Sequence, residues 1–187
     1  MTSNLVEHVS SFRREELHVP RKMGSEAIIL PKAFFKSTTQ MATTQDETRG
    51  VFITNPDVVG RSTVHRVVFM EVLGTGTSTS VYPVEARMKA AEELLRMHPS
   101  FRSIDFHVHT TGTGDSFHDR FSDGDFRTIA RNLSQAPGYK HVLLTPTHVL
   151  TFGTSKPTFH LDNSNNPQVM QEYQRLKAEF EAILQRR

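Results

Sequence analysis

Hydrophobic and polar residues alternate along the chain with two periods, one typical of strands and one typical of helices. Short runs rich in β-branched and aromatic residues predict strands. Apolar residues that recur every three or four positions predict amphipathic helices. The predicted strands are residues 47–54, 64–73, 101–109, 141–145 and 149–152. The predicted helices begin at Pro31, Pro83, Ser122 and Pro167.

Polar and turn-forming segments separate these elements. Residues 55–57 (Asn-Pro-Asp) predict a turn, and residues 110–121 predict a Gly-rich loop. Because the order lacks a regular βαβ alternation, we predict an α/β (α+β) domain with a mixed central β-sheet flanked by helices. The predicted domain spans residues 26–160. It follows an N-terminal extension, 1–25, and precedes a C-terminal amphipathic helix, 167–187.

The composition limits the chemistry that is open to this chain. Its 187 residues, enough for one domain, include ten His and no Cys. The absence of Cys excludes a disulfide framework, a Cys-ligated zinc or iron–sulfur site and a thiol nucleophile. Any metal site must therefore use His, Asp and Glu side chains.

The charge pattern indicates which partners to expect. The chain has 22 Lys+Arg and 20 Asp+Glu, interspersed, for a net charge of +2. Without a block of like charges, we expect no nucleic-acid partner. The longest apolar runs, such as residues 67–70, are too short for a bilayer, and residues 1–14 lack the apolar core of a secretion signal. We therefore expect a soluble, cytoplasmic protein with no membrane partner.

The first candidate for chemistry is the pair His107 and His109, at the end of the strand predicted over residues 101–109. Side chains two apart in a strand point to the same face. The two imidazoles are thus placed to bind one metal ion together. The alternative is a polar strand end with two solvated imidazoles.

Ser122 and Asp125 open the next predicted helix. A Ser followed three residues later by an acidic residue is typical of a capping box, and that local role alone accounts for both residues. A second role is compatible with it, because a capped helix start holds Asp125 in a fixed position. With His107, His109 and Asp125 as ligands, one coordination position stays open, as in catalytic zinc sites.

Together these motifs resemble the JAMM/MPN+ zinc metalloproteases, in which a Glu precedes an H-x-H pair at a strand end and S-x-x-D opens a helix. The resemblance covers about residues 27–152, including the order of strands and helices. It implies a single MPN/cytidine-deaminase-like domain with one Zn²⁺ per chain. It also assigns five positions: the zinc ligands His107, His109 and Asp125, the general base Glu47 and the oxyanion-binding Ser122.

The chain departs from the family pattern after the second His. Twelve residues, 110–121, separate His109 from Ser122, more than is usual in the family, and Thr110 stands where Pro is usual. The enlarged loop contains or adjoins four further candidate ligands: Asp115, His118, Asp119 and Asp123.

Glu71, in the strand predicted over residues 64–73, is an alternative general base. Choosing Glu71 would leave no pair of strands before His107, whereas Glu47 precedes such a pair and has Gly50 at the family's offset. We therefore favour Glu47. Its non-catalytic alternative is a solvated residue at a helix–strand junction.

The resemblance implies a zinc-dependent metalloprotease or isopeptidase. Its substrate would be a conjugate of ubiquitin or a ubiquitin-like protein, cleaved at an amide or isopeptide bond at the modifier's C-terminus. The flexible modifier tail would lie in extended form beside a strand edge, by β-augmentation. This chemistry needs no thiol, which agrees with the absence of Cys.

Two other functions remain open. Residues 105–110 resemble the opening of PHP-type metal phosphoesterases, but only 78 residues follow His109, too few for the rest of that barrel. A non-catalytic MPN-like scaffold is the second, although such relatives usually lack the ligands. Residues 167–187 either pack on their own domain, which we favour, or dock a second copy in a homodimer or a larger complex.

Overall fold

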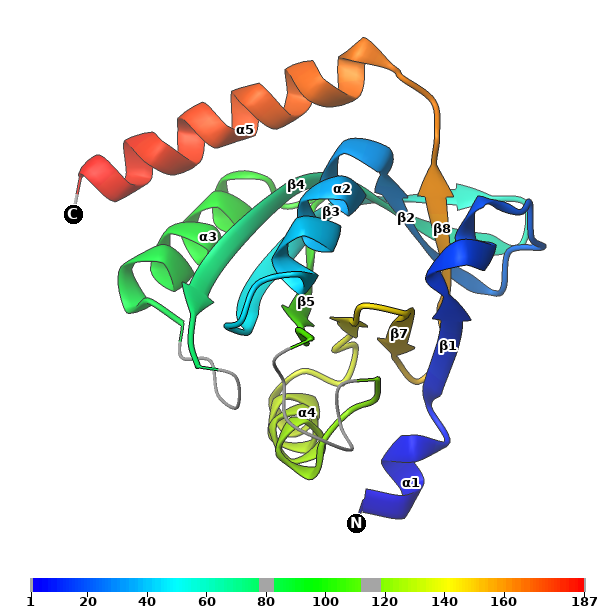
Figure 1. Ribbon diagram of the computed structural model, residues 1–187. Helices are drawn as coiled ribbons and strands as arrows, with labels where there is room; N and C mark the ends of the chain where they lie inside the picture. The colour runs from blue at the N-terminus through cyan, green and yellow to red at the C-terminus, as the bar shows by residue number, and fades with distance from the viewer. Residues whose placement is uncertain (1, 78–82, 112–118, 187) are drawn as a thin grey trace.

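The computed structural model describes residues 2–77, 83–111 and 119–186. In this part of the chain, eight strands form one mixed sheet, accompanied by five α-helices and a 3-10 helix (Figure 1). The strands are β1 (Val9–Arg13), β2 (Glu26–Pro31), β3 (Thr48–Val59), β4 (Ser62–Thr75), β5 (Arg102–Val108), β6 (His141–Leu144), β7 (His148–Phe152) and β8 (Thr158–Asp162). The helices are α1 (Thr2–Val6), η1 (Arg14–His18), α2 (Lys32–Ala42), α3 (Glu85–Met97), α4 (Asp123–Gln135) and α5 (Pro167–Gln185).

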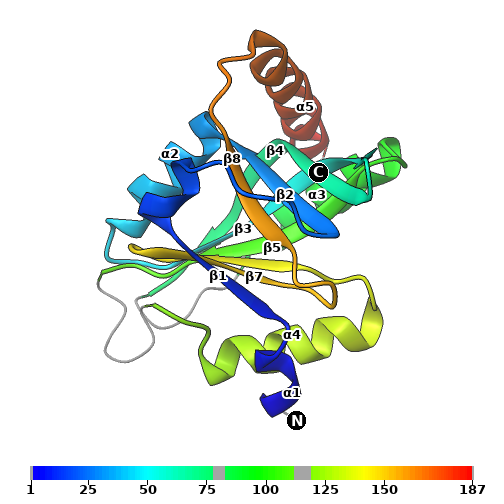
Figure 2. The same cartoon turned by 90° about the vertical axis from the view of Figure 1, so that its right-hand side faces the viewer.

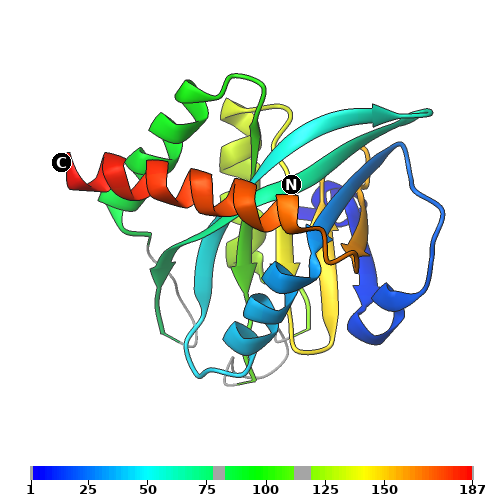
Figure 3. The same ribbon diagram turned by 90° about the horizontal axis from the view of Figure 1, so that it is seen from above.

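The sheet has the strand order β1-β7-β6-β5-β3-β4-β2-β8. Strands β3 and β4 form a long antiparallel hairpin that Figure 3 shows from above, and β5 joins β3 in antiparallel register. Strands β5 and β6 are parallel, as are β2 and both of its neighbours. The sheet is so strongly curved that β7 and β8 contact each other, and its shape is nearly that of a barrel.

The concave side of the sheet encloses the main hydrophobic core. The rings of Phe52 on β3 and Phe106 on β5 stack there with their centroids 4.4 Å apart. Helix α2 adds Phe34 and Phe35 to this core, on the apolar side that the sequence predicts. The interior is therefore filled mainly by apolar side chains.

In strand β5, apolar residues alternate with polar ones. Ile104, Phe106 and Val108 point into the core. Because successive side chains of a strand point to opposite faces, Asp105 and His107 lie on the outer face of the sheet.

Two separate groups of helices cover the outer face (Figure 2). Helices α3 and α5 pack on β3 and β4 through residues such as Leu94, Phe180 and Phe69. Helix α4 packs on β6 and β7 through residues such as Phe126 and Leu143. The outer face of β5 lies between these two groups, so that polar residues there border both α3 and α4.

The structure confirms the mixed α/β class. It also confirms the helices predicted after Pro31, Pro83, Ser122 and Pro167. A central sheet flanked by helices describes it less well than a curved sheet around a core. Helix α5 packs on its own domain, against α3 and β4, the arrangement that we favoured for residues 167–187.

Three sequence-based expectations need correction. Residues 55–57 continue β3 rather than forming a turn, and the chain reverses near Gly60, whose φ is +63°. Pro56 is tolerated there because β5 pairs with β3 only as far as Thr54, which leaves no neighbour on that side to need its N–H.

The other two corrections concern the edges of the sheet. The predicted extension, residues 1–25, contains β1, which pairs with β7 in antiparallel register. Strand β8, which the sequence did not predict, pairs in parallel with β2. Both are five-residue strands with a single buried residue each, Phe12 and Phe159, so their apolar pattern is weak. None of the described helices is both long and apolar enough to cross a lipid bilayer.

Candidate metal centre

Strand β5 delivers both histidines of the candidate site. His107 lies on the outer face near the end of the strand, and His109 follows its last residue. The backbone N–H of His109 donates to the carbonyl of Leu144 at 2.9 Å, which extends the pairing of β5 with β6 by one residue. Both imidazoles are buried, with exposed fractions of 6% and 2%. They are therefore not the solvated pair that was the alternative.

The first turn of α4 supplies the third side chain. Ser122 is the N-cap residue, and the predicted capping box is confirmed. The Ser122 Oγ accepts from the backbone N–H of Asp125 at 3.2 Å, and Asp125 Oδ2 accepts from the backbone N–H of Ser122 at 2.7 Å. Ser122 also donates its hydroxyl to Asp125 Oδ2 at 2.8 Å. These bonds fix the Asp125 carboxylate in one orientation toward the histidines.

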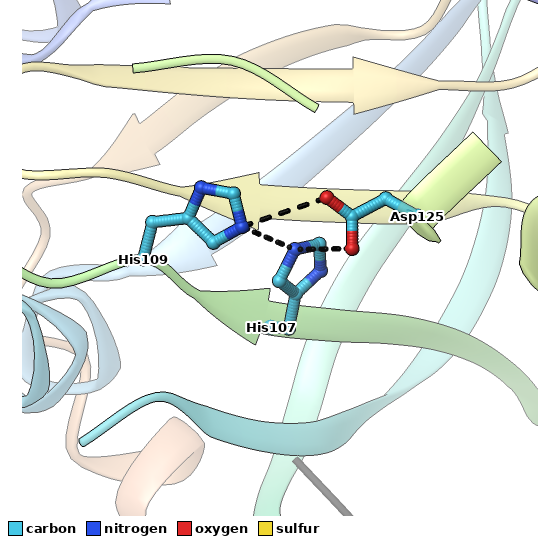
Figure 4. Close-up of side chains that lie close together, drawn as sticks. All are labelled: His107, His109 and Asp125. Carbon is cyan, nitrogen blue, oxygen red and sulfur yellow. Dashed lines mark hydrogen bonds and ion pairs between the residues drawn. The ribbon is translucent and has the colours of Figure 1, made fainter. Parts of the chain in front are cut away.

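The three side chains converge on one point (Figure 4). The Nε2 atoms of His107 and His109 are 3.1 Å apart. Asp125 Oδ1 lies 3.2 Å from His107 Nε2, and Asp125 Oδ2 lies 3.5 Å from His109 Nε2. Two ligand atoms of a tetrahedral zinc lie about 3.4 Å apart, from metal–ligand distances near 2.1 Å. The donor atoms are thus spaced as ligands of one ion, and this is the one such group among the described residues.

The charge state of the group also suits a cation. Burial lowers the pKa of His107, so its imidazole is neutral at neutral pH and keeps a lone pair that can bind a metal ion. Burial alone would raise the pKa of Asp125, but the neighbouring histidines, His107 first, and the backbone N–H of Ser122 hold it well below its ordinary value. The carboxylate is therefore ionised, and the group can hold a metal ion with two neutral ligands and one anionic ligand.

Glu47 lies beside this group, one residue before β3. Its Oε1 is 3.9 Å from His109 Nε2, and its side chain is nearly buried. The Glu47 backbone is held at both ends, since its N–H donates to the carbonyl of Thr77 and its carbonyl accepts from the N–H of Gly76. Glu47 is therefore not the solvated junction residue of the alternative.

Gly50 is required by close packing. A Cβ at this position would collide with the Glu71 carbonyl oxygen and the Phe106 ring. The register between β3 and β4 shifts between Arg49 and Gly50, so an irregularity of the sheet lies three residues from Glu47.

Glu71, the alternative base, has a different environment. Its buried carboxylate pairs with Arg87 of α3 and, at 2.8 Å, with Lys177 of α5. Glu71 thus ties two helices to β4. The geometry places Glu47, and not Glu71, beside the candidate ligands.

Of the other candidate ligands, the two that the structure describes do not join the group. Asp119 pairs with Arg120 at 3.0 Å, and Asp123 is an exposed residue in the first turn of α4. Asp115 and His118 lie outside the described residues, as does most of the loop predicted over residues 110–121.

Three polar residues behind His107 were not predicted. His141 Nε2 lies 2.6 Å from His107 Nδ1, and Tyr139 OH lies 2.7 Å from His141 Nδ1. Tyr139 donates in turn to Asp105 Oδ2 at 2.9 Å. The sequence signals for these residues were a His at the start of one predicted strand and an Asp within another. The sequence does not predict the parallel pairing of β5 with β6, which sets Asp105 opposite His141.

A groove of about 660 Å³ lies on the same outer face, between α3 and α4. Its floor includes Arg49, Ser103 and Asp105, and Tyr139 also lines it. The groove therefore reaches the chain of polar residues that ends at His107. In comparisons with known proteins, neither a family nor a curated protein matched this chain.

Proposed function

We propose that this protein is a zinc-dependent hydrolase of amide or isopeptide bonds, of the JAMM/MPN+ type. The observation that carries the proposal is the convergence of His107, His109 and Asp125, from a strand end and a separate helix, with the Glu47 carboxylate beside them. Two imidazoles and one carboxylate leave one position of a tetrahedral ion open, which is the pattern of catalytic zinc. The order of strands and helices supports an MPN-like domain.

When bound, zinc would supply a Lewis acid that activates water and polarises the scissile carbonyl. Glu47 would accept the proton of the attacking water and pass it to the leaving amine, as a general base and then a general acid. Its position on the His109 side of the group, 3.9 Å from Nε2, suits that role.

Ser122 would stabilise the oxyanion of the tetrahedral intermediate through its hydroxyl. That hydroxyl now donates to Asp125 Oδ2, so it must turn away from Asp125 to serve a substrate. The two hydrogen bonds of the capping box that involve backbone N–H groups do not use the hydroxyl proton. The start of α4 therefore stays capped when the hydroxyl rotates.

The proposed substrate is a conjugate of ubiquitin or a ubiquitin-like protein, whose C-terminal tail is extended and flexible. The groove between α3 and α4 supports this choice, because it is open at the surface and runs along the outer side of β3 and β5. Its lining includes two arginines, Arg49 and Arg131, and two carboxylates, Glu92 and Asp105, with apolar residues between them. Such a lining suits a polar main chain with small side chains.

A cleavage assay with matched variants tests the proposal. The protein is loaded with zinc, its metal content is measured by elemental analysis, and it is tested on ubiquitin-like fusions and Lys-linked isopeptides. Glu47→Gln should keep one zinc and lose about two to four orders of magnitude in turnover. The control Glu15→Gln changes an exposed carboxylate and should leave the zinc content and the turnover unchanged. Full activity of Glu47→Gln, or a wild-type protein that does not retain zinc, would contradict the proposal.

A further inference from the structure

A continuous chain of hydrogen bonds runs from His107 to the surface groove. It passes from His107 Nδ1 to His141 Nε2 at 2.6 Å and from His141 Nδ1 to the Tyr139 hydroxyl at 2.7 Å. Tyr139 then donates to Asp105 Oδ2 at 2.9 Å, and Arg49 donates to the same oxygen at 3.4 Å. Each hydrogen bond in this chain needs one donor and one acceptor, so the proton position at one link restricts the position at the next.

The carboxylate end sets the direction of the whole chain. An ionised Asp105 only accepts, so the Tyr139 proton points to it. The Tyr139 oxygen then accepts from His141 Nδ1–H, which leaves His141 Nε2 as an acceptor. That acceptor requires a proton on His107 Nδ1, and a neutral His107 then carries its lone pair on Nε2.

The Nε2 of His107 is the atom that faces His109 and Asp125. The opposite tautomer would place a proton on this atom and prevent it from binding a metal. Outer partners of metal-binding histidines commonly select the tautomer in this way.

We infer that Tyr139 and His141 are positioning residues that hold His107 in the tautomer protonated on Nδ1, so that Nε2 is ready to bind the metal. The inference rests on the proposed metal site and assigns it a second layer of residues. Both side chains act through His107 and are not among the candidate ligands.

On the Tyr139 side of the chain the surroundings agree with this direction, whereas Asp125 Oδ1, 3.2 Å from His107 Nε2, favours a proton on that nitrogen. Burial and the Asp105 carboxylate raise the pKa of Tyr139, so that its hydroxyl keeps its proton. Arg49 pairs with Asp105 at 3.4 Å, so the carboxylate lies between the Arg49 guanidinium and the Tyr139 hydroxyl.

The tautomer can be measured without any metal. Two-bond ¹⁵N–¹H correlation spectra of the metal-free protein, labelled with ¹⁵N-histidine, distinguish a protonated ring nitrogen from an unprotonated one. In the wild type we expect His107 to be protonated on Nδ1 alone. Tyr139→Phe removes the hydroxyl that accepts from His141, and His107 should then populate both tautomers. Tyr173→Phe, which removes a hydroxyl from a ring packed between Phe34 and Phe69, should leave the His107 signals unchanged.

Zinc affinity, measured by competition with a chromogenic chelator, gives the second readout. Tyr139→Phe should bind zinc about 10- to 100-fold more weakly than the wild type, the usual effect of losing an outer partner. His141→Gln keeps an oxygen that accepts from His107 Nδ1, whereas His141→Leu does not. We therefore expect most of the affinity to survive in His141→Gln and to be lost in His141→Leu, with thermal unfolding as a check that each variant is folded.

The outcomes separate this inference from the proposed function. A wild-type His107 protonated on Nε2, or a tautomer that Tyr139→Phe leaves unchanged, would overturn the inference even if zinc binds and substrate is cleaved. If the Nδ1 tautomer depends on Tyr139 but the protein binds no zinc, the inference about the tautomer stands and the proposed function fails.

Discussion

The Asp125 carboxylate has two roles, one in capping α4 and one as a candidate metal ligand. It accepts from the backbone N–H of Ser122 to close the capping box, and it faces His107 and His109 as a candidate ligand. Both tasks could be predicted from the sequence, since the first needs only local spacing and the second follows from the resemblance. The partner of His107 on its other side, His141, could not be predicted, because it lies 34 residues away on a neighbouring strand.

Alanine variants of the capping box should separate its two tasks. Ser122→Ala and Asp125→Ala should each lower the free energy of unfolding of the metal-free protein by about 1 kcal/mol, the usual cost of a lost helix cap. Only Asp125→Ala should also lose zinc, because Ser122 is not among the candidate ligands. Urea denaturation and elemental analysis measure the two effects. Unchanged zinc content in Asp125→Ala would exclude it as a ligand.

Strands differ in how strongly the sequence specifies them. The β3–β4 hairpin could be predicted because its strands contain long apolar runs, and β5 because Ile104, Phe106 and Val108 alternate with polar residues. The edge strands β1 and β8 bury one residue each, so their hydrophobic pattern is too weak to predict a strand. They form by pairing with β7 and β2. The prediction therefore placed the strands that carry the site and missed those that close the sheet.

A half-buried carboxylate, Glu26, links several of the strands. It pairs from β2 with His65 of β4 at 2.8 Å and with Lys140, just before β6, at 2.9 Å, and Ser155 also donates to it. Burial alone would raise the pKa of Glu26, but the bonds from Lys140 and His65 lower it below the ordinary value. A carboxyl with a lowered pKa in the folded state stabilises the fold above its unfolded-state pKa, and this contribution is lost as the pH falls.

Glu26→Gln should therefore destabilise the protein most near neutral pH. We expect the free energy of unfolding to fall by about 1–3 kcal/mol at pH 7, as for a lost hydrogen bond to a charged group. The difference from the wild type should shrink between about pH 5 and pH 3, where the wild-type carboxylate takes up its proton. Urea denaturation at several pH values measures it, and a difference independent of pH would show that Glu26 does not titrate as proposed.

The curvature of the sheet brings the parts of the candidate site together. It leaves the outer face of β5 between the helices α3 and α4, and that strip holds His107, Asp105 and the floor of the groove. No local pattern in the sequence predicts this, because it depends on the order in which the strands pair. The same order sets β6 beside β5 and so supplies the residues behind His107.

If the groove holds the substrate tail, filling it should weaken substrate binding without disturbing the metal. Thr128 lines the groove from α4, and Thr128→Trp would place an indole ring in the path of an extended chain. Ser134→Trp adds the same ring to the exposed side of the same helix and is the matched control. We expect Thr128→Trp to keep its zinc and to lose about 10- to 100-fold in kcat/KM, mainly through KM, since the loss is in binding rather than in chemistry. Equal kcat/KM values for the two variants would show that the substrate reaches the metal by another path, and the groove would then have no part in recognising the modifier.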